Sequence, residues 1–248
     1  MGSVRIGLAV ALALLGCLPS PGTAAPLSGP AHALPAGATR VLSVPGRLSR
    51  WAFVTRAAGI QGQPGAGRAS QGTLSLTTSD GTNELVELLA ERRVDREMWV
   101  EVRTSLWPSP GRGWVPLSAL SKFHHVNTWL IVDKRSLEAT LIAHGAVVFR
   151  APVGIGKPST PTPEGSFYIR DRLSGFAPGS LYGPLAFGTS AHSHVLSDWP
   201  GGAVVGIHGT NQPGLIPGRI SHGCIRMRNS DILRLGRLVG AGTPVTVR

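Results

Sequence analysis

Short apolar runs, many of them alternating with polar residues, recur along the chain after residue 50 and are separated by glycine, proline and aspartate. Alternation with a period of two is typical of half-buried β-strands. The strands expected in the first part of the chain are 51–54, 74–76, 86–89 and 98–102. We therefore predict a small β-barrel-like module over residues 50–122.

The pattern continues over residues 124–248, for which we predict a second, mainly β module. The strands expected there are 129–132, 139–142, 146–149, 166–169, 203–207 and 244–247. His144-Gly145 lies between two of them, as in a β-hairpin. One short C-terminal helix is expected, capped by Asn229 or Ser230 and followed by apolar residues spaced along one face.

The N-terminal segment, residues 1–25, has the layout of a secretory signal peptide, with one early cation, an apolar run from Ile6 to Leu18 and then small residues. The run is shorter than the roughly 20 residues of a membrane-spanning helix. Residues 14–17 also resemble a bacterial lipobox, so lipidation at Cys17 is the alternative to cleavage near Ala24. Either route predicts an extracytoplasmic protein, secreted or attached to the cell envelope.

Amino-acid composition predicts one disordered segment and limits the classes of molecule that the chain is expected to bind. Residues 26–49 are rich in proline, alanine, glycine and serine, which predicts a disordered linker. The 24 lysines and arginines outnumber the 13 acidic residues and give a net charge of +11. Because these cations are scattered and do not form a stripe with aromatic residues, we expect no nucleic-acid binding. An anionic cell envelope is the better match for the positive charge.

Cys224 stands out because the chain has only two cysteines, and the other, Cys17, lies in the signal-like segment. After export, Cys224 would have no intramolecular disulfide partner. An unpaired thiol in an oxidising compartment is either buried and inert or chemically active. Its polar neighbours favour chemistry.

A histidine and this cysteine form the strongest candidate for a catalytic pair. His208 precedes Cys224 by 16 residues, through a loop rich in glycine and proline that allows the chain to fold back. An adjacent imidazole takes the thiol proton and leaves a reactive thiolate. Gly223 permits a tight turn with backbone N–H groups free for an oxyanion. Arg226 and Arg219 are expected to lower the thiol pKa or to bind a substrate carboxylate.

These segments resemble the catalytic domain of the L,D-transpeptidases, the YkuD type. Residues 208–210 read His-Gly-Thr, and residues 221–226 read Ser-His-Gly-Cys-Ile-Arg. The segment 162–167 resembles the threonine-proline-x-glycine loop of the family, and 229–235 resembles the segment after its cysteine. The resemblance spans residues 125–248 and implies a β-sandwich-like fold.

The resemblance also implies roles for individual residues. Those assigned to catalysis are Cys224, His208, His222 and Gly223, and those assigned to substrate binding are Gly209, Thr210, Ser221 and Arg226. His208 would be the general acid and base, with the Gly209 carbonyl holding its second ring nitrogen. The N–H groups of Cys224 and Gly223 would form the oxyanion hole.

The implied reaction joins peptidoglycan stem peptides. Cys224 would attack the carbonyl of meso-diaminopimelate in a tetrapeptide stem, release D-alanine and form a thioester. An amine of a neighbouring stem would then resolve the thioester into a cross-link. The resemblance implies neither an organic cofactor nor a metal, and it implies carbapenem β-lactams as inhibitors.

Other interpretations remain open from the sequence. Water as acceptor would make the chain an L,D-carboxypeptidase, and a protein lysine would make it a protein-to-wall attachment enzyme. Papain-like peptidases have the opposite order of cysteine and histidine, and in sortases the histidine lies much further upstream.

Residues 99–102 and 113–115 resemble the end of a bacterial Src-homology-3-like domain, a module that often binds wall peptides. A non-enzymatic wall-binding protein is therefore a further alternative, and a plain β-barrel spacer is the simpler interpretation of this module.

Two histidine pairs complete the candidates. His192 and His194 have a spacing that suits zinc ligands, but no supporting acidic motif lies nearby, so we expect no metal site. His124 and His125 are expected in the segment between the modules, without a chemical role.

Overall fold

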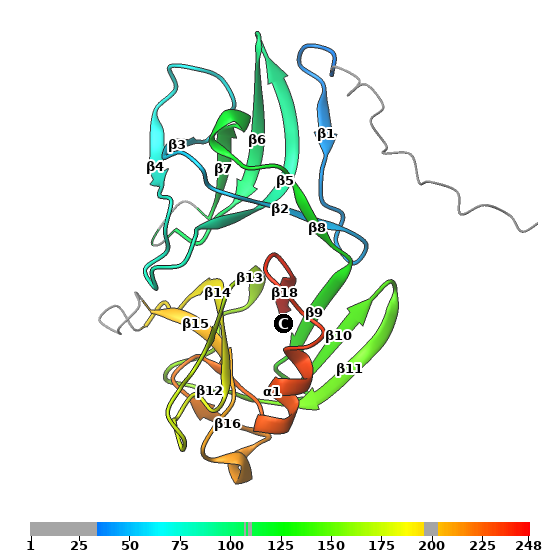
Figure 1. The fold of residues 1–248 in the computed structure, drawn as a ribbon, viewed down its shortest axis with the longest axis vertical. Coiled ribbons are helices and arrows are strands. Elements are labelled where there is room, and N and C mark those ends of the chain that lie inside the picture. Colours follow the sequence, from blue (N-terminus) through cyan, green and yellow to red (C-terminus); the bar gives the residue numbers. More distant parts are fainter. Residues whose placement is uncertain (1–33, 107, 109–110, 196–202) are drawn as a thin grey trace, which may run out of the picture. The chain divides into compact units, whose positions relative to one another are not determined.

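The described residues form two β-sheets, and the first contains the strands before residue 127 (Figure 1). The computed structural model describes residues 34–106, 108, 111–195 and 203–248. The strands of the first sheet are β1 (Thr39–Val41), β2 (Ser49–Phe53), β3 (Ala58–Gln61), β4 (Ser70–Leu74), β5 (Leu85–Val94), β6 (Glu97–Arg103), β7 (Arg112–Pro116) and β8 (His124–Val126). Their order is β4-β3-β7-β6-β5-β2-β8, and β1 also pairs with β5. A short 3₁₀ turn, Leu117–Ala119, follows β7.

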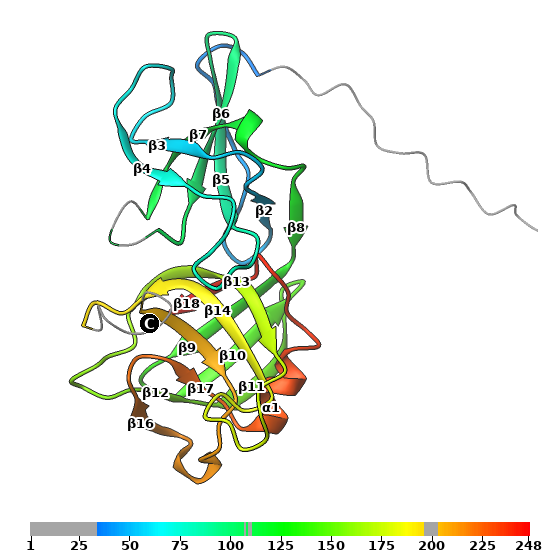
Figure 2. The ribbon, with the colours of Figure 1, turned by 60° about the vertical axis from the view of Figure 1, so that its left-hand side comes forward.

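The second sheet has the order β11-β10-β9-β18-β13-β14-β15-β17-β12-β16 (Figure 2). Its strands are β9 (Thr128–Asp133), β10 (Glu138–Ala143), β11 (Ala146–Pro152), β12 (Gly154–Gly156), β13 (Gly165–Ser174), β14 (Leu185–His192), β15 (Val204–His208), β16 (Gly218–Ser221), β17 (Ile225–Arg226) and β18 (Pro244–Val247). A 3₁₀ turn, Pro213–Leu215, precedes β16. Helix α1 spans Asn229–Leu235.

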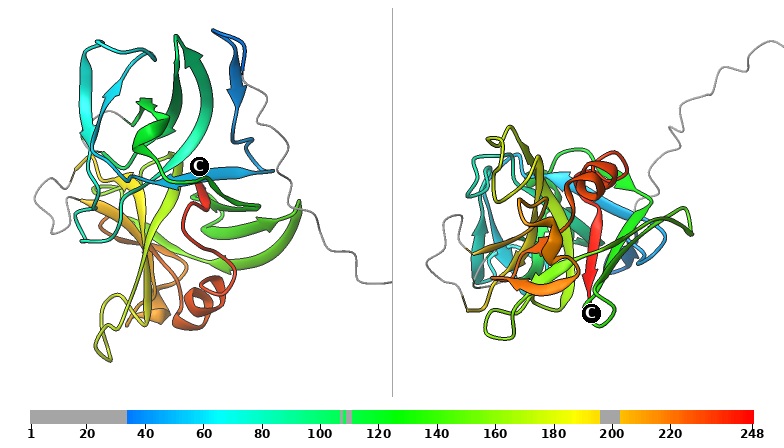
Figure 3. Two further views of the ribbon diagram at one scale, coloured as in Figure 1. Left: turned by 45° about the horizontal axis from the view of Figure 1, so that its top comes forward. Right: turned by 90° about the horizontal axis from the view of Figure 1, so that it is seen from below.

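Strand β13 divides the second sheet into two halves. Its residues 165–168 pair with β18, whereas residues 169–174 pair with β14, and the register shifts between Ile169 and Asp171. A bulge of this kind bends a strand and lets it serve both layers of a sandwich. Figure 3 shows the red strand β18 beside β9, its parallel partner. Buried residues of both halves and of α1 form one core, so the mainly β, sandwich-like prediction is confirmed.

Local sequence explains the strands that were predicted correctly. The hairpin of β10 and β11 turns at His144 and Gly145, which have φ angles of 50° and 81°. Two successive positive φ angles match the twist of the flanking strands. The expected helix is present, but the predicted cap was wrong, because α1 begins at Asn229 with Arg228 at its N-cap and no side-chain cap. The Asn229 side chain instead accepts a hydrogen bond from Thr210 N–H. Among the described residues, α1 is the one α-helix.

Several expectations about boundaries need correction. The linker prediction for 26–49 was wrong in part, because Thr39–Val41 form β1 and pair with β5. His124 and His125 do not lie in a segment without secondary structure, because they belong to β8, which pairs with β2. The His124 ring stacks on Trp51 with ring centroids 4.4 Å apart. The signal-like segment 1–25 lies outside the described residues. Within the described ranges, no helix has the length and hydropathy needed to cross a membrane.

Candidate active site

The segments around His208 and Cys224 lie side by side because the strands β15 and β17 pair in parallel. His208 is the last residue of β15, and Cys224 directly precedes β17. The pairing of β15 with β17 sets His208 opposite Arg226. The intervening loop therefore returns, as the sequence predicts. Both side chains line a pocket of about 360 Å³.

Gly206 lies between the two candidate catalytic side chains. Its N–H group donates to Cys224 Sγ at 3.4 Å. A Cβ atom on Gly206 would lie 3.7 Å from His208 Cδ2 and 3.9 Å from Cys224 Sγ. The imidazole and the thiol thus flank the same glycine. Within the described part of the chain they share no direct hydrogen bond, which is common for catalytic pairs without bound substrate.

His208 is buried, with 3% of its surface exposed, and its tautomer is fixed. Nδ1 lies 2.7 Å from the Gly209 carbonyl oxygen and therefore carries the proton. Nε2 is left as an acceptor. The pKa of His208 is lowered to about 4, mainly by burial and to a smaller extent by the charge of Arg226, while the hydrogen bond to Gly209 acts in the opposite direction. The ring is neutral at pH 7 and able to accept a proton.

Cys224 is partly exposed, and its thiol is held in the neutral form. Burial raises the pKa of Cys224, whereas the Gly206 N–H group and the charge of Arg226 lower it. Arg226 therefore acts in the predicted direction, but desolvation outweighs it. Arg219 does not line this pocket, since its guanidinium donates to the Lys134 carbonyl at 3.1 Å. The expectation that Arg219 adds charge beside the thiol was wrong.

The turn before Cys224 is stabilised by hydrogen bonds of the Ser221 hydroxyl. Gly223 has a φ of 118°, a conformation that favours glycine. Its N–H donates to Ser221 Oγ at 3.1 Å, and Ser221 Oγ donates to the Cys224 carbonyl at 2.5 Å. Gly223 N–H is thus already engaged, contrary to the predicted oxyanion hole. The Cys224 N–H has no acceptor among the described residues.

The predicted catalytic residue His222 and the predicted substrate-binding residues divide by whether they line the pocket. Arg226 and His222 line the pocket, whereas Gly209 and Thr210 do not. Thr210 is fully buried, and its N–H donates to Asn229 Oδ1 at 2.8 Å. Ser221 borders the pocket but its hydroxyl is engaged in the turn. The structure therefore gives Thr210 and Ser221 contacts that hold loops in place.

Sequence reasoning missed several contributors to this site. Asn229 was expected only to cap a helix, but it ties α1 to the loop after His208. Tyr182 packs edge-on against the His208 ring at a centroid distance of 5.0 Å. The Thr162 hydroxyl donates to the Gly223 carbonyl at 2.8 Å, which gives the threonine of the 162–167 loop a structural role. Only Thr162 carried a signal, through its motif.

Among the described residues, those that line the pocket include basic side chains and no acidic one. Its wall contains Lys157 and Arg226 together with apolar side chains such as Val205 and Ile220. Arg226 is 8% exposed, and its Nε has no hydrogen-bond partner among the described residues. A buried, unpaired guanidinium N–H favours an anionic ligand.

The two histidines considered as metal ligands lie elsewhere. His192 and His194 border a different hollow from the one that contains Cys224. The described residues contain no cluster of three or more histidine, cysteine or acidic side chains placed to hold a metal ion.

The buried His208 predicts an acid-dependent loss of stability. Its pKa falls from 6.5 to about 4 on folding, so the unfolded chain binds the proton more readily between these values. The contribution is present above pH 6.5 and is lost as the pH falls toward 4, by about 3 kcal/mol in total. Between pH 6.5 and 4, the free energy of unfolding of His208→Gln, measured with denaturant, should fall by about 3 kcal/mol less than that of the wild type. His125→Gln, at an exposed position, is the control, and equal falls in all three proteins would contradict the assignment.

Comparison with known proteins agrees with this geometry. Residues 127–247 match the model of the YkuD family, the L,D-transpeptidase catalytic domain. The putative L,D-transpeptidase YqjB of Bacillus subtilis is 30% identical over 129 residues, which cover 48% of this chain and 70% of that protein. The chain belongs to the L,D-transpeptidase family. The family predicted from the motifs is therefore confirmed.

Other relatives are matched over shorter stretches. The putative L,D-transpeptidase YkuD of Bacillus subtilis is 37% identical over 44% of this chain and 58% of its own length. The chain therefore spans little more than half of that relative. Among solved structures, the catalytic domain of an L,D-transpeptidase from E. faecium is 30% identical and covers 49% of this chain and 96% of its own, with a TM-score of 0.36.

Proposed function

We propose that this L,D-transpeptidase family member cross-links peptidoglycan stem peptides through a thioester on Cys224. The observation that carries the proposal is the convergence of His208 and Cys224 on Gly206, inside a pocket with an unpaired arginine N–H. Family membership supports an acyl transfer at this site.

In the first half-reaction, Cys224 Sγ attacks the carbonyl carbon of meso-diaminopimelate as its proton passes to His208 Nε2. The Gly209 carbonyl keeps Nδ1 protonated and stabilises the imidazolium that forms. Because thiol and imidazole are both neutral at rest, the proton moves during the attack and no preformed ion pair is required. The Cys224 N–H, which has no acceptor among the described residues, donates to the developing oxyanion.

Collapse of the tetrahedral intermediate breaks the peptide bond. The leaving amine of D-alanine takes the proton from His208, and the acyl group remains on sulfur as a thioester. In the second half-reaction, His208 removes a proton from the acceptor amine as it attacks the thioester. The new amide is released, and Cys224 recovers its proton.

Arg226 and Lys157 are the groups proposed to recognise the substrate. Both line the pocket, and no acidic side chain of the described residues does. Carboxylates of the stem peptide match this charge. The apolar part of the wall, which includes Val205 and Ile220, would contact the alkyl chain of the acyl donor. The same chemistry supports carbapenems, which are carboxylate-bearing acylating agents, as inhibitors.

The test is incubation of the purified chain with tetrapeptide stems, followed by muropeptide analysis. Cross-linked dimers and free D-alanine in equal amounts are expected. D-Alanine without dimers would replace the proposal by a carboxypeptidase, and dependence on an added protein lysine would indicate wall attachment. Wall binding with neither product would leave a non-enzymatic binding protein.

We also propose that the chain acts outside the cytoplasm, where it contributes to cell-wall biogenesis and cell shape. The signal-like segment 1–25 and the excess of basic residues support this location. The mass of the mature protein from cells tests it. A cut near Ala24 would indicate secretion, a lipid on Cys17 would indicate anchoring, and an unprocessed chain in the cytoplasm would contradict both.

A further inference from the structure

We propose that residues outside the pocket hold the Val205–Gly206 peptide so that its N–H group stays directed at the Cys224 sulfur. The positioning residues are Thr189, Gly188, Asp171, Arg170 and Asp80. The consequence for catalysis rests on the proposed role of Cys224 as nucleophile. The last of these residues, Asp80, belongs to the first sheet's module.

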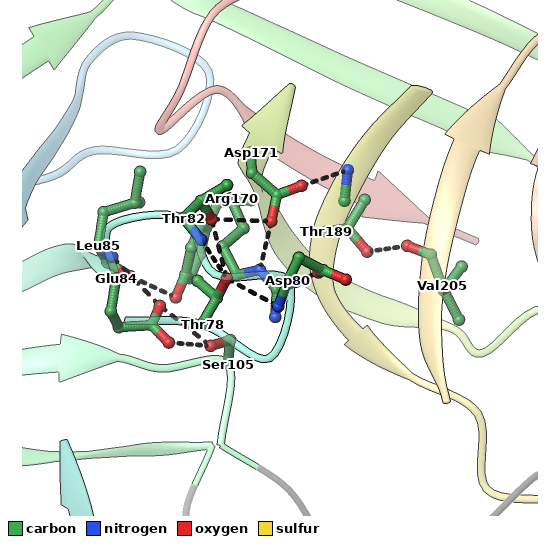
Figure 4. A network of polar contacts seen from close by, with 12 residues as sticks. Thr78, Asp80, Thr82, Glu84, Leu85, Ser105, Arg170, Asp171, Thr189 and Val205 are labelled. Atoms are coloured by element: carbon green, nitrogen blue, oxygen red, sulfur yellow. Dashed lines mark hydrogen bonds and ion pairs between the residues drawn. The ribbon is translucent and has the colours of Figure 1, made fainter. Parts of the chain in front are cut away.

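Thr189 fixes the orientation of the peptide directly. Its hydroxyl donates to the Val205 carbonyl at 2.6 Å (Figure 4). The same planar group carries the Gly206 N–H, and in a trans peptide the carbonyl and the N–H point in opposite directions. A hydrogen bond on one side therefore directs the N–H toward Cys224 Sγ on the other, at 3.4 Å. Thr189 is only 1% exposed, so water does not replace its hydroxyl.

The Thr189 side chain is needed to hold the Val205 carbonyl because the backbone pairing of β14 with β15 is irregular at this point. Gly188 pairs with Gly206 and His192 pairs with Val204, so three residues of β14 lie opposite the single residue Val205. Bulges interrupt the backbone hydrogen bonds of a ladder and re-aim the chain. In this bulge, a side-chain donor holds the Val205 carbonyl.

Asp171 holds Gly188, the residue of β14 that pairs with Gly206 of β15. Gly188 N–H donates to Asp171 Oδ1 at 3.0 Å. A Cβ atom on Gly188 would lie 2.1 Å from that oxygen, so only glycine fits beside the carboxylate. Because Gly188 is the ladder partner of Gly206, the position of Asp171 also constrains the strand segment that carries the donor.

A buried arginine connects Asp171 to the first sheet. Arg170 Nε donates to Asp171 Oδ2 at 2.9 Å, and its Nη2 forms an ion pair with Asp80. Asp80 lies in the loop between β4 and β5, and Thr82 of the same loop donates to Asp171 at 3.4 Å. Arg170 is 3% exposed at its side chain, and a charge at such depth is stable only with its partners in place. Figure 4 shows the group as one connected network.

The expected chemical effect is on the thiolate. A donated N–H bond stabilises a charged sulfur more than a neutral thiol, so it favours ionisation of Cys224. If the Val205–Gly206 peptide tilts, this stabilisation weakens and fewer molecules carry a thiolate at neutral pH. Reactivity of the thiol toward an alkylating agent then falls, whether or not any substrate is present.

The experiment measures the rate of Cys224 alkylation by iodoacetamide across pH, read by mass spectrometry of the Cys224 peptide in the full chain. At pH 7, Thr189→Val should react roughly fivefold more slowly than the wild type, with the pH profile shifted upward. Thr189→Ser, which keeps the hydroxyl, should restore the wild-type profile. Asp80→Asn, in the first sheet's module, should react about twofold to threefold more slowly.

Two controls separate positioning from general destabilisation. Thr140→Val removes a partly buried hydroxyl from β10, and Glu101→Gln neutralises the partner of Arg112 within the first sheet. Both should keep the wild-type profile. Wild-type profiles in Thr189→Val and Asp80→Asn would overturn the proposal, as would a shift of equal size in the controls. If Thr189→Val does not fold, Asp80→Asn alone decides. Alkylation needs no peptide substrate, so failure of the muropeptide assay would leave this result standing.

Discussion

Replacing Cys224 by alanine is expected to abolish D-alanine release from tetrapeptide stems, with a fall of about 10⁵-fold or more. The variant removes the atom that forms the thioester, and no other cysteine is found among the described residues. The neighbouring groups that orient the reaction, His208 and the Gly206 N–H, would have no nucleophile to act on. The initial rate of D-alanine release measures the effect.

The Cys224 variant needs evidence that it is folded, because the sulfur contacts Gly206 N–H. Its unfolding midpoint should stay near that of the wild type, since a partly exposed side chain is removed. Cys224→Ser provides a second nucleophile of similar size but weaker reactivity, and it should also be inactive. A rate within tenfold of wild type in Cys224→Ala would show that another residue performs the chemistry.

Replacing His208 by glutamine is expected to slow turnover by about 10² to 10⁴-fold. Glutamine fits the buried position as a polar side chain but does not accept and return a proton. The loss should appear in kcat, because His208 acts on the reacting atoms and contributes little to holding the stem peptide. Steady-state kinetics with the tetrapeptide stem measure both parameters.

His222 provides a matched control for His208, since both histidines line the same pocket. His222 is exposed and lacks the bond between Nδ1 and the Gly209 carbonyl that fixes the tautomer of His208. His222→Gln should therefore retain far more activity than His208→Gln. Equal losses in the two variants would remove the specific role given to His208.

The strands that sequence predicted best are those with clear local signals. The hairpin of β10 and β11 has an apolar run on each side of a His144-Gly145 turn, so neighbouring residues alone define it. Strand β14 gave no such signal because all but its last residue are buried and the alternation disappears. Strand β1 is three exposed residues that depend on β5 for every pairing.

At the site, too, the features with a local sequence signal were predicted, and those that depend on the folded chain were not. The motif containing Cys224 and its distance from His208 were visible in the sequence, and the parallel pairing of β15 and β17 brings both to one pocket. The state of the thiol was not visible, because it depends on whether burial outweighs Arg226. Gly223 N–H was expected to be free because the sequence did not show that Ser221 Oγ accepts it. Thr189 acts through a bulge that only the folded sheet creates.

Formation of an acyl-enzyme on Cys224 is tested by intact-protein mass spectrometry after incubation with a carbapenem. We expect one added carbapenem mass on the wild type, located by peptide mapping at Cys224, and none on Cys224→Ala. An adduct of the same mass on Cys224→Ala, or one mapped to another residue of the wild type, would contradict it.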